Sequence, residues 1–130
     1  MQLSEVRDWL KTFNAADYYY IGRLDNKKQK SLGVYNRQRS GFPVMALGGS
    51  DNSSYNIKSI SLLLHWNQNA RETEEAAWTL WNHLLGQTNV DVGNQHIQYL
   101  RLMIPEPVSV GTDDNGVYEY VIEFDLYYRR

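Results

Sequence analysis

The sequence predicts an α+β domain in which a mostly antiparallel β-sheet carries two helices packed on one face. Two segments, 56–66 and 117–129, alternate apolar with polar residues, as strands with one buried face do. Two others, 3–13 and 69–86, repeat apolar residues at three- and four-residue steps, which is typical of helices lying on a core. A chain of 130 residues has room for one ordinary core, so residues 1–130 are expected to form a single domain.

The first helix is expected at residues 3–13, with Ser4 as a candidate N-cap and Glu5 in its first turn. Its apolar stripe consists of Leu3, Val6, Leu10 and Phe13. Aromatic and β-branched residues then surround the polar run NKKQK, which predicts a β-hairpin over residues 17–37. Gly22 and Gly33 fall inside this hairpin, where a bulge or a close backbone approach is expected.

Glycines and a proline dominate the next segment, so residues 41–54 are expected to form a mobile connection with one short strand at 44–47. A central strand follows from residue 56. One of its faces should carry Ile60, Leu62, Leu64 and Trp66. The opposite face should carry Ser59, Ser61, Leu63 and His65.

The second helix should begin at the N-cap Asn69, with Glu72 three residues later in a capping-box arrangement, and end at Gly86. Its buried stripe is expected to contain Ala77, Trp78, Trp81, Leu84 and Leu85. A polar turn that contains Asn89, Asp91 and Gly93 comes next, and after it a kinked or edge strand at 96–104, ended by two prolines.

The run GTDDNG predicts a turn before the longest strand, at residues 117–129. One face of this strand should carry Tyr118, Tyr120, Ile122, Phe124, Leu126 and Tyr128, and the other Glu119, Glu123 and Asp125. Such a long strand is either paired within the subunit's own sheet or paired with a neighbouring subunit, and both alternatives stay open. The packing core is expected to include Leu62, Leu64, Trp66, Trp78, Trp81 and Phe124.

No arrangement of residues in the sequence is typical of an active site. His65, His83 and His96 lack the short spacing of metal ligands, so structural or surface roles are favoured. The glutamates at 72, 74 and 75 are explained by the dipole of a helix N-terminus. Nucleophile elbows, phosphate loops and dinucleotide fingerprints are absent, as are cysteines, so no catalytic residue, metal site or cofactor is expected. No membrane-spanning run is found either.

One cluster of positive charge stands out in a chain whose net charge is -2. It consists of Lys27, Lys28, Lys30, Arg37 and Arg39. A solvated hairpin tip and a surface that contacts a partner or phosphates explain it equally well. Few aromatic residues are interleaved at the tip, unlike in a surface that binds single-stranded nucleic acid.

Three stretches carry a resemblance to a known family: YYYIGRLDNKKQKSLGVYN, NSSYNIKSISLLLHWNQNARETEEAAWTLWNHLLG and PVSVGTDDNGVYEYVIEFDLYYRR. Together they resemble minor capsid or tail terminator proteins of long-tailed bacteriophages that infect Gram-positive hosts. The resemblance implies a tail-terminator-like α+β subunit that forms a ring with copies of itself, as a hexamer, at the head-proximal end of the tail tube.

The same resemblance implies what such a ring does. It would stop polymerisation of the tail tube protein and present a face to the head-tail connector proteins, with DNA passing through its lumen without being read in sequence. It also implies a location in the virion tail, after assembly in the host cytoplasm. Two other classes remain open: a small nucleic-acid-binding module that uses the basic tip, and a monomeric adaptor with one exposed patch.

Overall fold

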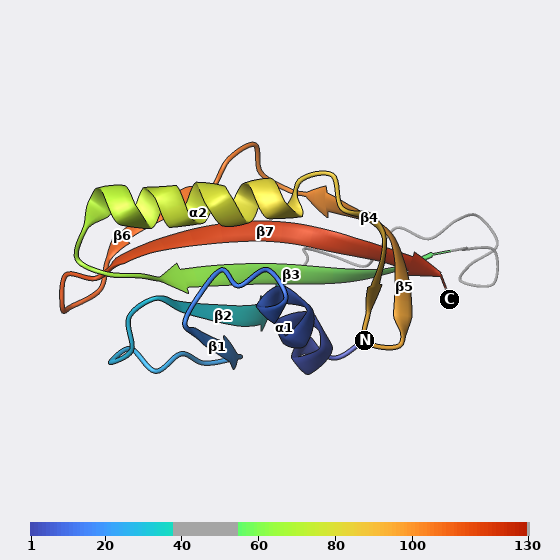
Figure 1. Cartoon of the computed structure of the whole chain (residues 1–130), viewed down its shortest axis with the longest axis horizontal. Coiled ribbons are helices and arrows are strands. Elements are labelled where there is room, and N and C mark those ends of the chain that lie inside the picture. The colour runs from blue at the N-terminus through green and yellow to red at the C-terminus, as the bar shows by residue number, and fades with distance from the viewer. Residues whose placement is uncertain (38–54, 130) are drawn as a thin grey trace.

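The computed structural model describes residues 1–37 and 55–129, which form two helices and a seven-stranded sheet (Figure 1). The expected irregular connection and its short strand at 44–47 lie outside the described residues. The elements in chain order are α1 (Leu3–Lys11), β1 (Tyr18–Ile21), β2 (Ser31–Asn36), β3 (Tyr55–His65), α2 (Ala70–Leu84), β4 (Thr88–Val92), β5 (Gln95–Leu102), β6 (Val108–Thr112) and β7 (Tyr118–Arg129).

Strands β3 and β7 form the centre of the sheet. They pair antiparallel along their whole length, from Tyr55 opposite Arg129 to His65 opposite Glu119. The other side of β7 pairs with β6 over its first residues and with β5 over its last ones. The long terminal strand is therefore internal to the subunit's own sheet, and the alternative that it pairs with a neighbouring subunit is wrong.

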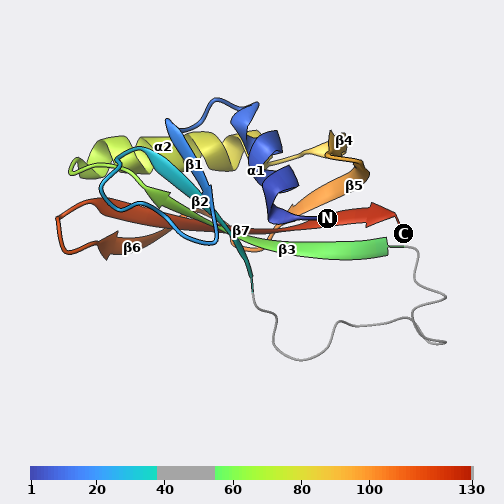
Figure 2. The ribbon, with the colours of Figure 1, turned by 90° about the horizontal axis from the view of Figure 1, so that it is seen from below.

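Both helices lie on the same face of the curled sheet (Figure 2). This arrangement confirms the predicted α+β class, since every strand pair except β1–β2 is antiparallel. The core between the helices and the sheet contains Val6, Leu10, Leu62, Leu64, Leu80, Leu84, Ile122, Phe124 and Leu126, all at most 1% exposed. Burial of this apolar surface is the main force that holds the helices on the sheet.

Helix α2 is rotated relative to the stripe that the sequence predicts. Its buried row is Thr73, Ala77, Leu80 and Leu84. Trp78 and Leu85 are 37% and 56% exposed and lie outside the core, whereas Trp66 and Trp81 are partly buried at its margin. The small side chains of Thr73 and Ala77 let the helix backbone approach β7, while an indole at position 78 would hold the helix away from the sheet.

The N-cap and the glycine end of α2 are those that the sequence predicts, but the capping box is incomplete, because the Asn69 amide donates to the Asn67 side chain and not to Glu72. The Asn69 side chain accepts a hydrogen bond from the Glu72 amide, and Gly86 follows the last turn with a φ of 80°, which favours glycine. The N-cap of α1, in contrast, is Gln2 and not Ser4. The Gln2 carbonyl accepts hydrogen bonds from the Glu5 and Val6 amides, so the helix begins at Leu3, two residues earlier than it would with Ser4 as its N-cap.

The predicted hairpin over residues 17–37 is wrong, because β1 and β2 run parallel, with Tyr18 beside Ser31. The connection at 22–30 turns away at Gly22, where φ is 68°, and returns to the end where β1 began. The Lys30 amide donates to the carbonyl of Trp66, the residue after β3, and this bond helps to fix the return. Gly33 does lie at a close approach, since a Cβ there would be 2.7 Å from the Tyr35 ring.

Two strands are missing from the sequence prediction. Residues 88–92 form β4, which pairs antiparallel with β5, so the segment at 87–94 is half of a hairpin and not only a turn. Consequently β5 lies between β4 and β7 and is no edge strand, although its register shifts between Ile97 and Tyr99. The second missing strand, β6, is short and wholly exposed, so it lacks the apolar alternation that reveals a buried face.

Candidate functional site

Three connections meet at the end of the sheet where β3 ends and β7 begins, and we call this region the loop end (Figure 1). It comprises residues 22–30, 66–69 and 113–117. Backbone bonds join the second of these to the start of β7: the Trp66 amide donates to the Tyr118 carbonyl, and the Tyr118 amide donates to the Asn67 carbonyl. The loop end is therefore an extension of the central strands rather than a set of separate loops.

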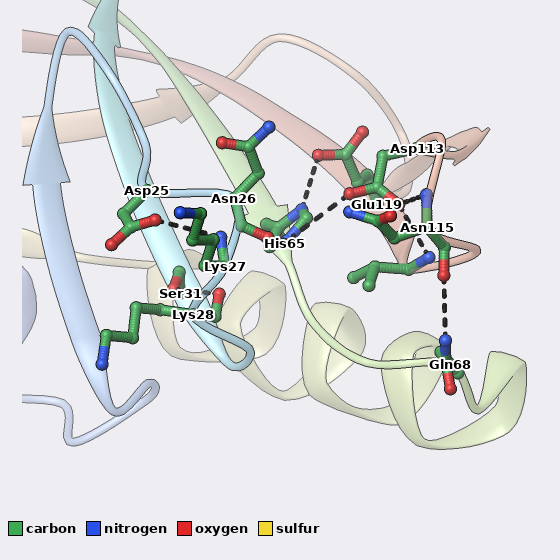
Figure 3. A network of polar contacts seen from close by, with 11 residues as sticks. Asp25, Asn26, Lys27, Lys28, Ser31, His65, Gln68, Asp113, Asn115 and Glu119 are labelled. Carbon is green, nitrogen blue, oxygen red and sulfur yellow. Dashed lines mark hydrogen bonds and ion pairs between the residues drawn. The ribbon is translucent and has the colours of Figure 1, made fainter.

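His65 lies beneath the loop end and is fully buried (Figure 3). Its Nδ1 is 2.9 Å from Glu119 Oε2, and its Nε2 is 3.1 Å from the Asn26 carbonyl. Asp113 Oδ2, which has no hydrogen-bond partner among the described residues, lies 3.7 Å from the same Nε2. One imidazole thus holds the 22–30 connection, the 113–117 turn and strand β7 together.

The contacts of His65 are those of a side chain that holds segments of the chain together. A carboxylate and a carbonyl both accept hydrogen bonds, so both ring nitrogens donate when the imidazole is doubly protonated. Both ring nitrogens lie against protein acceptors and the ring is fully buried, so neither nitrogen faces an open site where a metal ion or a substrate could bind.

Tyr35 lies on β2, beside β3, and the pKa of its phenol is affected by burial and by the Glu119 carboxylate. Burial raises the pKa of its phenol above the ordinary value of 10.0, and the negative charge of Glu119 raises it further. A backbone hydrogen bond at Leu24 opposes this shift in pKa. The phenol is consequently neutral at physiological pH and adds no charge to the loop end.

The 22–30 connection carries exposed positive charge. Lys27, Lys28 and Lys30 are all exposed, and the Lys28 ammonium lies 5.5 Å from the centre of the Tyr18 ring. Arg23 is exposed in the same connection and was not among the residues that the sequence singled out. These four cations form the basic surface of the loop end, with Asp25 as the acid among them.

Arg37 and Arg39 do not extend this surface within the described residues. Arg37 follows the far end of β2, and its guanidinium forms an ion pair with Asp125 of β7. Only 18% of the Arg37 side chain is exposed, so its charge is used inside the subunit, which corrects its place in the predicted cluster. Arg39 lies outside the described residues.

Strand β6, on the other side of the loop end, presents a different surface. All five of its residues are exposed, with Val108 at 43% and Val110 at 51%. Glu106 precedes the strand and Asp114 follows it, and both are exposed. The sequence offered only the neighbouring GTDDNG turn as a signal of this apolar strand with acidic ends.

The remaining candidate groups are dispersed. His83 stacks on Phe13, and His96 Nδ1 lies 2.9 Å from Asp91 Oδ1 at the surface. Within the described residues no group of three or more metal-binding side chains forms, and no helix is long and apolar enough to cross a membrane.

An open hollow beside the basic connection is lined by Tyr20, Arg23, Leu24, Asp25 and Asn26. It holds no pair of groups placed for acid-base or nucleophilic chemistry.

Comparisons with known proteins give one result. A family model described as "Bacteriophage tail terminator protein" matches residues 8–130, which include every strand and α2. No curated protein matches the chain.

Proposed function

The chain belongs to the bacteriophage tail terminator family, and we propose that it forms a ring at the head-proximal end of the tail tube. The family consists of structural virion proteins, so the chain is a structural tail-completion protein of a phage. In our proposal the ring is a hexamer that assembles in the host cytoplasm, stops polymerisation of the tail tube and joins the tail to the head connector. The match over residues 8–130 is the observation that carries this proposal.

The geometry supports a structural role. Paired strands β3 and β7, with α2 packed on them, give the subunit a fixed shape, and the bonds of His65 hold the loop end on that frame. Fixed loops present the same surface in every copy, as a ring of identical contacts requires. Both helices and every strand except the exposed β6 contribute side chains to one core, which supports the proposal that residues 1–130 act as a single domain.

Electron microscopy of particles made without this protein tests the proposed function. We expect tails of uncontrolled length, or tails and heads that never join, because nothing would close the tube. Supplying the wild-type chain in the same cells should restore both tail length and joining. Particles with normal tails attached to heads in the absence of the chain would rule the proposal out.

The exposed lysines of the loop end favour a second candidate, in which the chain contacts nucleic acid. Lysines that line a ring lumen would meet the phosphates of passing DNA without reading its sequence. We expect charge reversal of Lys27, Lys28 and Lys30 together to lower infectivity. A reversed variant that assembles, passes DNA and infects normally would remove these lysines from the proposal.

A stand-alone nucleic-acid-binding module differs from a ring former in a measurable way. Such a module should bind free DNA with an affinity that falls steeply as salt concentration rises. A ring former should instead bind purified tail tubes. Binding to free DNA without binding to tubes would favour the module, and a stable monomer that binds neither would favour an adaptor.

A further inference from the structure

We propose that successive subunits of the ring join through their sheets, the outer edge of β6 in one copy pairing antiparallel with the outer edge of β1 in the next. This inference rests on the ring of the proposed function and names the contact that closes it. Both partners are copies of this chain, and the contact is heterologous, since two different edges meet.

The first support is that both edges are open. Among the described residues β6 pairs only with β7, and β1 pairs only with β2. All of β6 is exposed, and Tyr18 and Ile21 at the two ends of β1 are each 41% exposed. An exposed strand edge with apolar side chains and unpaired backbone groups favours pairing with another strand.

The third outer edge of the sheet, β4, is less suited to such a contact. Its hairpin turn lies against α1, and a Cβ at Gly93 would be 2.7 Å from the Glu5 side chain. Strand β4 also lies in the half of the sheet that is remote from the loop end, because it pairs with β5, and β5 pairs with the last residues of β7. Strands β1 and β6, in contrast, flank the same half, on either side of β2, β3 and β7.

Strand direction selects the antiparallel arrangement. From β6 to β7 to β3 to β2 each step reverses direction, and β1 keeps the direction of β2, so β6 and β1 run oppositely within one subunit. A ring repeats one rotation, so each copy keeps the strand directions and the helix-covered face of the copy before it. The β1 edge of the next copy therefore meets β6 antiparallel. A parallel contact would need the next copy turned over, which repeated rotation in one sense does not produce.

Charge supports a contact between unlike edges. The segment around β6, residues 105–114, has three acids, Glu106, Asp113 and Asp114, and no base. The segment around β1, residues 17–30, has four bases, Arg23, Lys27, Lys28 and Lys30, against two acids, Asp17 and Asp25. Pairing two β6 edges would bring acids together, and pairing two β1 edges would bring bases together, whereas the unlike pair brings opposite charges together.

The opposite charges also lie at matching ends of the two strands. In the antiparallel contact Thr112 stands near Tyr18 of the next copy, so Asp114 comes close to Lys28, which lies over the Tyr18 ring. At the other end Val108 stands near Ile21, which brings Glu106 close to Arg23, two residues beyond Ile21. Both ends of the contact thus gain an attraction between charges.

Cysteine crosslinking on tails tests this contact, because the chain has no cysteine of its own. Tails that carry the double variant Tyr18→Cys/Thr112→Cys are treated with a short thiol crosslinker and separated by denaturing electrophoresis. We expect a ladder of covalent oligomers, because each copy is joined to the next. The matched control Ile21→Cys/Thr112→Cys should give at most a weak ladder, because these two positions lie at opposite ends of an antiparallel contact.

The other outcomes overturn the inference. A stronger ladder from the Ile21 pair than from the Tyr18 pair means parallel strands. Crosslinked dimers from Val110→Cys alone, at the centre of β6, mean that two β6 edges meet. No ladder from either pair on tails of normal length that have joined heads means that other surfaces close the ring, while the tail-completion function stands.

A charge swap gives an independent test that leaves both strands unchanged. We expect Lys28→Glu and Asp114→Lys each to lower the amount of chain retained on purified tails several-fold, and the double variant to recover much of it. Arg71→Glu, an exposed reversal on α2, serves as control and should leave retention unchanged. If the double variant loses as much retention on tails as the two single variants lose together, the predicted pairing is contradicted.

Discussion

His65 shows how one side chain can position several segments. Alternation along β3 places it on the face away from the helices, and there it is fully buried because Asn26, Asp113 and Glu119 enclose it. Removing one partner of a buried hydrogen-bonded group leaves the other partners unsatisfied, and this is usually costly. The role of His65 is to position the loop end, so its loss should affect the loops before it affects the core.

Replacement of His65 by leucine is expected to lower the free energy of unfolding by about 1–3 kcal/mol, because Glu119 and the Asn26 carbonyl lose their hydrogen-bond partner in a poorly hydrated place. Amide hydrogen exchange should rise within residues 22–30 and 113–117 and stay slow in β3. His96→Leu is the matched control, since His96 is at the surface, and it should change neither quantity. Unchanged exchange at residues 22–30 in His65→Leu would show that the histidine does not hold this connection.

Tyr35 gives the loop end a dependence on alkaline pH. Its pKa is raised in the folded chain, so the unfolded chain loses the phenol proton first as pH rises. The resulting stability is complete below the ordinary value of 10.0 and is lost as pH rises from there through the folded pKa. Urea unfolding measured between about pH 9 and 11 should show a steeper loss for wild type than for Tyr35→Phe. Equal slopes would contradict the assigned environment.

At the scale of the elements, α2 shows which features of a helix can be predicted from its sequence and which cannot. The N-cap at Asn69 and the end at Gly86 are local features, and both were predicted from the sequence. The buried row differs from the predicted stripe because a helix with apolar residues on more than one side can be rotated without changing its period. Contact with β7 decides the rotation, and it favours Ala77 and Leu80 over Trp78.

Leu80→Ala is expected to lower the free energy of unfolding by about 2–5 kcal/mol, because it leaves a cavity at a site that is 1% exposed. Trp78→Ala should cost clearly less, although it removes a larger side chain, because Trp78 is 37% exposed. Chemical denaturation followed by circular dichroism measures both values. A larger loss for Trp78→Ala would restore the stripe that the sequence predicts.

At the scale of the whole molecule, the two ends of the sheet differ. The loop end carries the basic connection, the acidic turn and the fixed contacts of His65, while the N-terminus lies toward the other end (Figure 1). An N-terminal tag should therefore leave the loop end accessible. The open edges of β1 and β6 flank the half of the sheet that ends in these loops, so contacts between copies and contacts with the tube or connector would lie close together.

The proposed ring predicts the number of copies per particle. Quantitative mass spectrometry of purified tails should find one hexamer of this chain per tail, because a closed ring has a fixed number of subunits. The tube protein of the same tails serves as internal reference. A copy number that grows in proportion to the tube protein across tails of different length would show a coat along the tube and not a ring at its end.

The sequence by itself determined the features that depend on neighbours along the chain. These are the strand alternation of 56–66 and 117–129 and the caps of the second helix. The stretches that resemble tail terminators also indicated the family that the match over residues 8–130 shows.

Only the tertiary structure decided which segments meet. Asn26 and Glu119 contact His65 although they are 39 and 54 residues away from it in the sequence. Asp125 forms an ion pair with Arg37 from 88 residues away, so Arg37 does not belong to the exposed basic cluster. The parallel course of β1 and the rotation of α2 likewise depend on contacts with β3 and β7. The physical reason is that periodicity records which side of an element is buried, whereas the partner and the direction of approach are set by packing among segments remote in the chain.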